Sequence, residues 1–186
     1  MVSQNGQSEL KVPPQRSGNT LNGPFDMICA VNRRDMFIRE ATNADRDGVI
    51  NLVSRVLAEF QLPFEPDSKD ADLVDIERMY IQAGGIFEVI EDQGGRLLGT
   101  YGLFPLNDIT CELRKMYFLR EIRGRGLGRE VLERAVEHAR LGFKTMVLKT
   151  ISVLKRAIQV YKRFGFVPTT MDHPNARADQ RFVLNL

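Results

Sequence analysis

Apolar and polar residues follow two spacings along this chain, and each spacing predicts one kind of element. A period of two, or a short apolar run, indicates strands, which we expect at residues 36–40, 86–91, 96–104, 110–118, 145–149, 166–169 and 181–186. Apolar residues three or four apart indicate helices, which we expect at about residues 42–59, 70–82, 127–142 and 152–164. Ser152 is suited to cap the last helix and Gly165 to end it.

The order of these elements predicts the fold class. A Gly94–Gly95 turn joins two strands as a hairpin, whereas the later helices cross from one strand to another. We therefore predict one α/β domain at residues 35–186, with a mixed central sheet of about six to seven strands flanked by about four helices. Residues 1–34 are rich in Ser, Asn, Gln, Gly and Pro, and such a segment buries too little apolar surface to order itself. We expect a flexible tail there.

Composition and charge exclude several classes of protein. The formal net charge of the 186 residues is only +2, which argues against a nucleic-acid partner. Cys29 and Cys111 lack the spacing of a zinc site or a disulfide framework, so we expect no metal, and Cys111 is expected to be a buried thiol. The sequence shows no apolar run that could span a bilayer and no secretory signal, which predicts a cytoplasmic protein without a membrane partner.

A glycine-rich turn at residues 123–128 carries the candidate chemistry. Its sequence, Arg-Gly-Arg-Gly-Leu-Gly, follows a strand and opens a helix. Glycine lets the main chain adopt positive φ and approach a ligand closely. Free N–H groups at a helix N-terminus converge on an anion, and the helix dipole supports them. Arg123, Arg125 and Arg129 add positive charge, so we expect the turn to bind a ligand with phosphate groups.

Two common nucleotide loops do not fit this turn. The P-loop requires Lys followed by Ser or Thr after its last glycine, and the turn has neither. The dinucleotide fingerprint GxGxxG is replaced by GxGxG, at Gly124, Gly126 and Gly128, and an acidic residue that ends a strand about twenty positions later is missing. A turn that merely connects a strand to a helix stays open as the alternative.

Two motifs together resemble the GNAT superfamily of N-acetyltransferases. Arg123-x-x-Gly126-x-Gly128 resembles the family's (Q/R)xxGx(G/A) pyrophosphate loop, and residues 157–166, AIQVYKRFGF, resemble its helix with Ala, Tyr and Gly-Phe. With the order of elements, the resemblance covers about residues 36–186. It implies an enzyme that moves the acetyl group of acetyl-CoA to a primary amine of a small molecule by direct attack in a ternary complex. It also leaves a homodimer open.

The resemblance further implies how acetyl-CoA is bound. It places the pantetheine arm in a gap between strands 110–118 and 145–149, beside the main chain of Met116, Tyr117 and Phe118. Main-chain amides of the turn would hold the pyrophosphate, and they belong to Arg123, Gly124, Arg125, Gly126, Leu127 and Gly128. The arginine side chains either reach the phosphates or are solvated.

Tyr161 and Glu112 are the candidate catalytic residues. Tyr161 stands where the family has the tyrosine that protonates the departing thiolate, and the alternative is a tyrosine that only packs in the core. Glu112 lies four residues before Met116, where some family members have a glutamate general base. An ion pair is the alternative for Glu112, because a neighbouring Arg114 would favour the ionised carboxylate.

Strand alternation makes a further prediction about these side chains. Glu112 and Arg114 should share one face of strand 110–118 with Met116, and Lys115 should lie on the opposite face. The acceptor is expected near loop 60–67, whose aromatic and acidic residues suit a small cationic or amphipathic amine. Two other functions stay open, namely acetylation of a protein or peptide and a regulatory domain that binds acyl-CoA without turnover.

Overall fold

The computed structural model describes residues 35–186, so the tail predicted at residues 1–34 lies outside the described residues. Seven strands form one sheet in the order β1-β2-β3-β4-β5-β7-β6. They are β1 (Met36–Glu40), β2 (Ile86–Asp92), β3 (Leu97–Asn107), β4 (Thr110–Phe118), β5 (Thr145–Thr150), β6 (Val167–Thr169) and β7 (Gln180–Asn185). Only β4 and β5 pair in parallel, and the other neighbours are antiparallel. The predicted mixed sheet of an α/β domain is confirmed.

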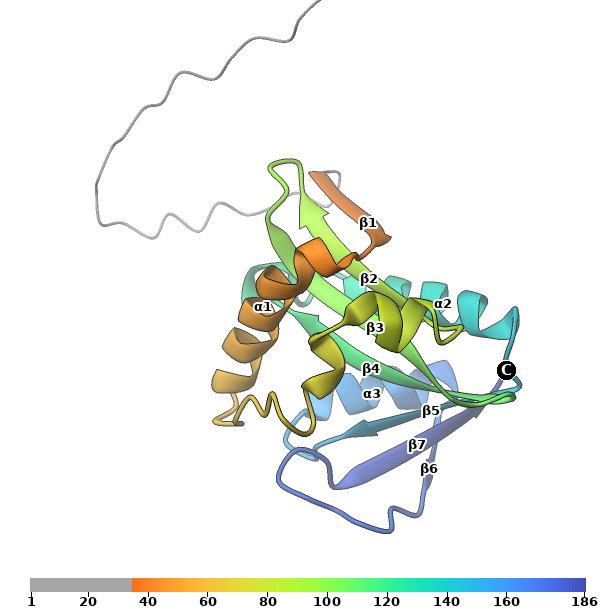
Figure 1. Cartoon of the computed structure of the whole chain (residues 1–186). Helices are drawn as coiled ribbons and strands as arrows, with labels where there is room; N and C mark the ends of the chain where they lie inside the picture. Colours follow the sequence, from red (N-terminus) through yellow and green to blue (C-terminus); the bar gives the residue numbers. More distant parts are fainter. Residues whose placement is uncertain (1–34) are drawn as a thin grey trace, which may run out of the picture.

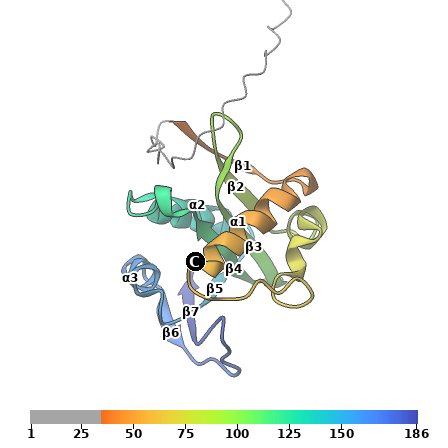
Figure 2. The same ribbon diagram turned by 90° about the vertical axis from the view of Figure 1, so that its left-hand side faces the viewer.

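Helices cover both faces of the sheet. One face carries α1 (Arg46–Ala58) and the segment around residues 70–82, and the other carries α2 (Leu127–Arg140) and α3 (Lys155–Phe164), as Figures 1 and 2 show. The apolar stripe predicted for α2 is buried as expected, at Leu127, Val131, Leu132, Ala135, Val136 and Ala139. A single core therefore runs along both sides of the central strands.

Two predicted helices differ from the structure. Residues 70–82 form a 3-10 turn at Ala71–Leu73 and a one-turn π-helix at Glu77–Ile81 instead of one continuous helix. The Asp75 carboxylate accepts a hydrogen bond from the Arg78 N–H (3.1 Å), which starts a new turn within the segment. The last helix begins at Lys155, because Ser152 donates its N–H (2.7 Å) and its hydroxyl (2.6 Å) to Asp179 rather than capping the helix.

A bulge interrupts β4 and breaks the predicted alternation. Arg114 pairs with Gly102 and Tyr117 with Thr100, so two residues of β4 face one residue of β3. The bulge includes Lys115, whose φ of +53° lies in the left-handed region. As a result, Lys115 does not lie on the face opposite Arg114, since both side chains reach Asp72, at 3.0 Å and 3.8 Å.

We expect Gly102 to be required for the packing of the segment that carries Asp72. A Cβ atom at Gly102 would lie 2.7 Å from the ring of Tyr80 and 2.8 Å from that of Phe87, and both rings are buried. Gly102→Ala should therefore lower the free energy of unfolding in urea by about 1–3 kcal/mol. Gly142→Ala is the matched control, because a Cβ atom there meets nothing within 4 Å. Equal stability of the two variants would contradict this packing role.

Candidate active site

A cavity of about 960 Å³ opens where β4 and β5 part. The parallel pairing of these strands ends at Leu113 and Leu148, although β5 runs on to Thr150 and β4 to Phe118. The cavity is lined by α1, by loop residues before the π-helix, by these two strand ends, by the start of α3 and by the loop before β7. The gap predicted between strands 110–118 and 145–149 is therefore present.

Six of the predicted site residues line this cavity: Glu112, Met116, Tyr117, Phe118, Arg123 and Tyr161. The others, Gly124, Arg125, Gly126, Leu127 and Gly128, lie in the following turn and at the start of α2. This turn is close to the cavity wall, since a Cβ atom at Gly128 would lie 3.8 Å from Phe118 and 3.9 Å from Met116. The fold thus brings the predicted residues together.

The glycine turn has the backbone that its sequence predicts. Gly124 has φ +79° and Gly126 has φ +83°, and Gly126 is the N-cap residue of α2. Both conformations suit glycine, and a Cβ atom at either residue would meet nothing within 4 Å. The two glycines therefore place no side chain over the first N–H groups of α2, which have no partner within the helix. Such N–H groups at a helix N-terminus are suited to bind an anion.

Arg123 is engaged within the protein. Its guanidinium donates to both carboxylate oxygens of Glu59 (2.7 and 3.0 Å), next to the end of α1, and its Nε donates to the Phe118 carbonyl (2.6 Å). The side chain thus fixes the turn to α1 and β4. The Arg123 side chain is therefore paired within the protein rather than merely solvated.

The Tyr161 hydroxyl lies at the parting of the strands. The residue is 8% exposed, and its oxygen lies 3.9 Å from the Met116 sulfur. Burial, with a smaller contribution from Tyr117, raises the pKa of the phenol above its usual value. The hydroxyl therefore keeps its proton at neutral pH, as a general acid must.

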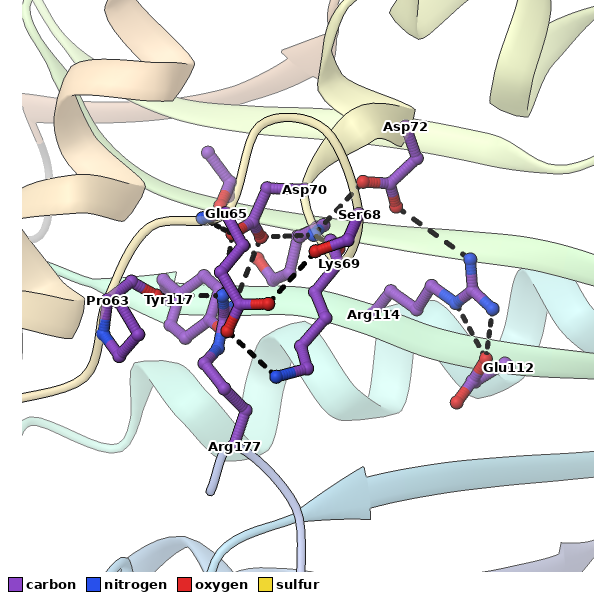
Figure 3. A network of polar contacts seen from close by, with 12 residues as sticks. Pro63, Glu65, Ser68, Lys69, Asp70, Asp72, Glu112, Arg114, Tyr117 and Arg177 are labelled. Atoms are coloured by element: carbon purple, nitrogen blue, oxygen red, sulfur yellow. Dashed lines mark hydrogen bonds and ion pairs between the residues drawn. The ribbon is translucent and has the colours of Figure 1, made fainter. Parts of the chain in front are cut away.

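Glu112 is buried (3% exposed) and surrounded by cations. Arg114 Nε donates to its Oε2 (2.6 Å), as Figure 3 shows. Lys149 Nζ lies 3.3 Å from its Oε1. The Arg114 guanidinium also stacks 3.9 Å over the Phe104 ring. The ion pair considered for Glu112 is present, inside the protein rather than on its surface.

A cluster around Asp70 joins three parts of the cavity wall. Asp70 is 1% exposed and accepts hydrogen bonds from Lys115 Nζ (2.6 Å), from Arg177 (2.6 and 3.1 Å) and from the Glu65 N–H (2.9 Å), as seen in Figure 3. Burial by itself would raise the pKa of Asp70, but these bonds outweigh it and lower the pKa to about 2. Sequence patterns did not indicate this cluster, because Asp70 lies 45 positions from Lys115 and 107 from Arg177.

Cys111 is a fully buried thiol, as predicted. Burial raises its pKa to about 12, which leaves the thiolate unavailable as a nucleophile at neutral pH. Within residues 35–186, the structure has no group of His, Cys, Asp and Glu side chains that could hold a metal ion. None of the helices in this part of the chain is long and apolar enough to cross a membrane.

Comparison with known proteins agrees with this geometry. The model of the acetyltransferase (GNAT) family matches residues 53–166. An uncharacterized N-acetyltransferase of Escherichia coli, YjgM, is 38% identical over 136 residues, which is 69% of this chain and 80% of that protein. An acetyltransferase structure from Streptococcus agalactiae superposes with a TM-score of 0.73 at 25% identity, and covers 82% of this chain and 99% of its own.

A second similar structure contains ligands. Spermidine N-acetyltransferase from Vibrio cholerae, in complex with CoA and spermine, superposes with a TM-score of 0.62 at 20% identity over 82% of this chain and 96% of its own. At this identity the likeness shows the fold alone. The family match and the relative from Escherichia coli go further: the chain belongs to the GNAT family, and it is an acyltransferase that uses acetyl-CoA.

We expect the Asp70 cluster to make stability depend on acid pH. The carboxylate has a pKa of about 2 in the folded protein and of about 4 when unfolded, so its stabilisation is complete above pH 5 and is lost as the pH falls towards 2. This loss is worth about 2 kcal/mol. Asp70→Asn should remove that pH-dependent part of the unfolding free energy, measured by urea denaturation, and should also lower stability at pH 7, because Lys115 and Arg177 stay buried without their partner.

Asp67→Asn is the matched control, since it makes the same change at an exposed residue of the same loop. Its stability curve should follow that of the unmodified protein. The unfolding free energy of Asp70→Asn could instead fall between pH 5 and pH 2 by as much as that of the unmodified protein. In that case the cluster would not have the assigned role.

Proposed function

We propose that the chain transfers the acetyl group of acetyl-CoA to a primary amine of a small molecule, by direct attack in a ternary complex. The observation that carries this proposal is the buried, protonated Tyr161 hydroxyl beside Met116, where β4 and β5 separate. In a cavity of this size a thioester and an amine can be held together. Membership of the GNAT family supports the same chemistry.

Acetyl-CoA would bind along β4. The main chain of Met116, Tyr117 and Phe118 would pair with the pantetheine amides as an added strand would, in the space that β5 leaves. The main-chain amides of Gly124, Arg125, Gly126, Leu127 and Gly128, together with that of Arg123, would hold the pyrophosphate. The Arg123 side chain would act indirectly, because its bonds to Glu59 and Phe118 fix the turn.

The reaction needs three contributions from the protein. The neutral amine attacks the thioester carbonyl, and a main-chain N–H near Met116 stabilises the negative charge that forms on the carbonyl oxygen. The carbon–sulfur bond then breaks, and Tyr161 gives its proton to the leaving thiolate. The proton released by the amine passes to a base, and Glu112 is the candidate because it lines the same cavity.

Glu112 would act as a base only in its ionised form. Arg114 and Lys149 hold this carboxylate in place on the cavity wall. The cytoplasmic location of the protein and its assembly as a homodimer remain predictions from the sequence.

Substitution of Gly126 tests the phosphate site. Gly126→Ala forces a side chain onto a residue with φ +83°, which should disturb the turn and weaken acetyl-CoA binding by about tenfold, measured by calorimetry. Gly84→Ala is a matched control, since Gly84 has φ +86° and the same open space but lies away from the cavity. Equal loss of affinity in both variants would contradict the assignment of the turn.

Substitution of the two candidate catalytic residues tests turnover. Tyr161→Phe and Glu112→Gln should each lower kcat by about 10²–10⁴-fold while the affinity for acetyl-CoA is kept. Tyr101→Phe is the control, because Tyr101 is also buried but donates to Glu88 outside the cavity. It should lower stability and leave kcat unchanged. Normal kcat in Tyr161→Phe would remove its role as an acid, and normal kcat in Glu112→Gln would restrict Glu112 to its ion pairs.

A further inference from the structure

The cavity has an excess of basic side chains. Among the described residues that line it, eight are basic and only Asp72 and Glu112 are acidic. Arg123, Lys155 and Arg156 lie toward the turn and the start of α3, where the phosphates of acetyl-CoA would bind. The remaining cations lie around the region where β4 and β5 separate, which under the proposed function receives the acceptor. Lys115 and Arg177 are paired with Asp70, and Lys69 is paired with Glu65. Arg114 and Lys149 share Glu112.

The acidic groups of this region are already neutralised by the protein. Asp72 accepts a hydrogen bond from Tyr80 at Oδ2, and its Oδ1 forms no hydrogen bond but lies 3.0 Å from Lys115 Nζ. Glu112 is paired with Arg114 and Lys149. A polyamine would therefore find its second ammonium group beside carboxylates that are already paired, and beside like charges.

The loop that suggested a cationic acceptor is similarly occupied. Glu65 binds Lys69 Nζ (2.8 Å) and the Ser68 hydroxyl (2.9 Å), so its carboxylate has partners within the loop. The charge pattern of the whole cavity thus differs from the expectation drawn from residues 60–67.

Lys149 is the cation best placed to meet an acceptor. It follows Leu148, the last residue of β5 that pairs with β4, and so stands at the edge of the opening. Its side chain is 46% exposed and lines the cavity. The ammonium group has three N–H donors, and its contact with Glu112 at 3.3 Å is a long one. Arg114, from the opposite strand, adds a second positive charge on the other side of Glu112.

We propose that the acetyl acceptor is an amine that also carries a carboxylate, such as a free amino acid, and that Lys149 binds this carboxylate. The inference rests on the proposed function and narrows its substrate class. An acceptor carboxylate at Lys149 would hold the adjacent amine near Glu112 and the thioester, which the reaction requires. The same fold binds spermine in the enzyme from Vibrio cholerae, so the fold leaves the sign of the acceptor charge undetermined, and the cavity residues decide it.

The test compares acceptors that differ only in the carboxylate. The full chain is assayed with acetyl-CoA and with leucine, leucinamide and 3-methylbutylamine, and with phenylalanine, its amide and 2-phenylethylamine, while the released thiol is followed. We expect higher kcat/KM for the amino acids than for their amides or amines. The amides are an informative control, because their amines are less basic than those of the amino acids and are therefore more reactive at neutral pH.

A variant links this preference to Lys149. Lys149→Met should raise the KM for the amino acid by about 10- to 100-fold, the effect of losing a hydrogen bond between charged groups, and should narrow the preference over the amide. Lys149→Arg should keep most of the preference. Lys144→Met is the matched control, since Lys144 is exposed just before the other end of β5 and outside the cavity, and it should leave the preference unchanged.

The outcomes separate this inference from the proposed function. If acetyl-CoA fails to bind in calorimetry, the proposed function itself is wrong. If acetyl-CoA binds and the amines or amides are acetylated as well as the amino acids, or better, only the acceptor class is wrong. Acetylation of none of these compounds by a chain that binds acetyl-CoA would also overturn the inference, as would an unchanged preference in Lys149→Met.

Discussion

The parting of β4 from β5 is the constraint on which the rest of the site depends. Hydrogen bonds between parallel strands are evenly spaced along the paired region. Here the pairing stops at Leu113 and Leu148, and a bulge at Lys115 follows directly in β4. The bulge bends the strand away, so that its main chain faces a cavity rather than a neighbour. Tyr161, Glu112 and Lys149 gain access to one space only because this separation exists.

Such a bulge needs support from its surroundings, because Lys115 adopts a φ of +53°. This left-handed conformation is energetically unfavourable for a residue that has a side chain. The Lys115 side chain supplies part of that support through Asp70, Asp72 and the Lys69 carbonyl (2.8 Å), and its own carbonyl accepts a bond from the Thr100 hydroxyl (2.7 Å). These contacts hold the lysine at both ends. Compared with apolar residues of similar size, a buried ion pair adds little net stability, although removal of one partner alone is costly. The specific role of these pairs is therefore to fix one backbone conformation.

Arg177 extends the same cluster to the far wall of the cavity. It reaches Asp70 from the loop before β7, and also donates to the Pro63 carbonyl (3.1 Å) and approaches the Tyr117 hydroxyl (3.4 Å). Three chain segments are therefore connected through one buried carboxylate (Figure 3). The acceptor side of the cavity has a defined shape and a defined charge as a consequence.

The sequence predicted those features that depend on neighbouring residues. The α2 stripe, the Gly94–Gly95 hairpin and the positive φ of Gly124 and Gly126 all follow from local spacing. Contacts between distant residues were missed, such as the Asp70 cluster and the pair of Arg123 with Glu59. The single helix predicted for residues 70–82 failed for a related reason, since local hydrogen bonds of Asp75 and the tertiary bonds of Asp70 outweigh helical spacing.

A crystal structure of the full chain with bound CoA would test the role of the separated strands most directly. We expect the pantetheine arm to lie between β4 and β5, with its amides bonded to the main chain near Met116, its sulfur near the Tyr161 hydroxyl and its pyrophosphate at the Gly124–Gly128 turn. CoA bound elsewhere on the domain, with β4 and β5 closed against each other, would contradict the central role given to their separation.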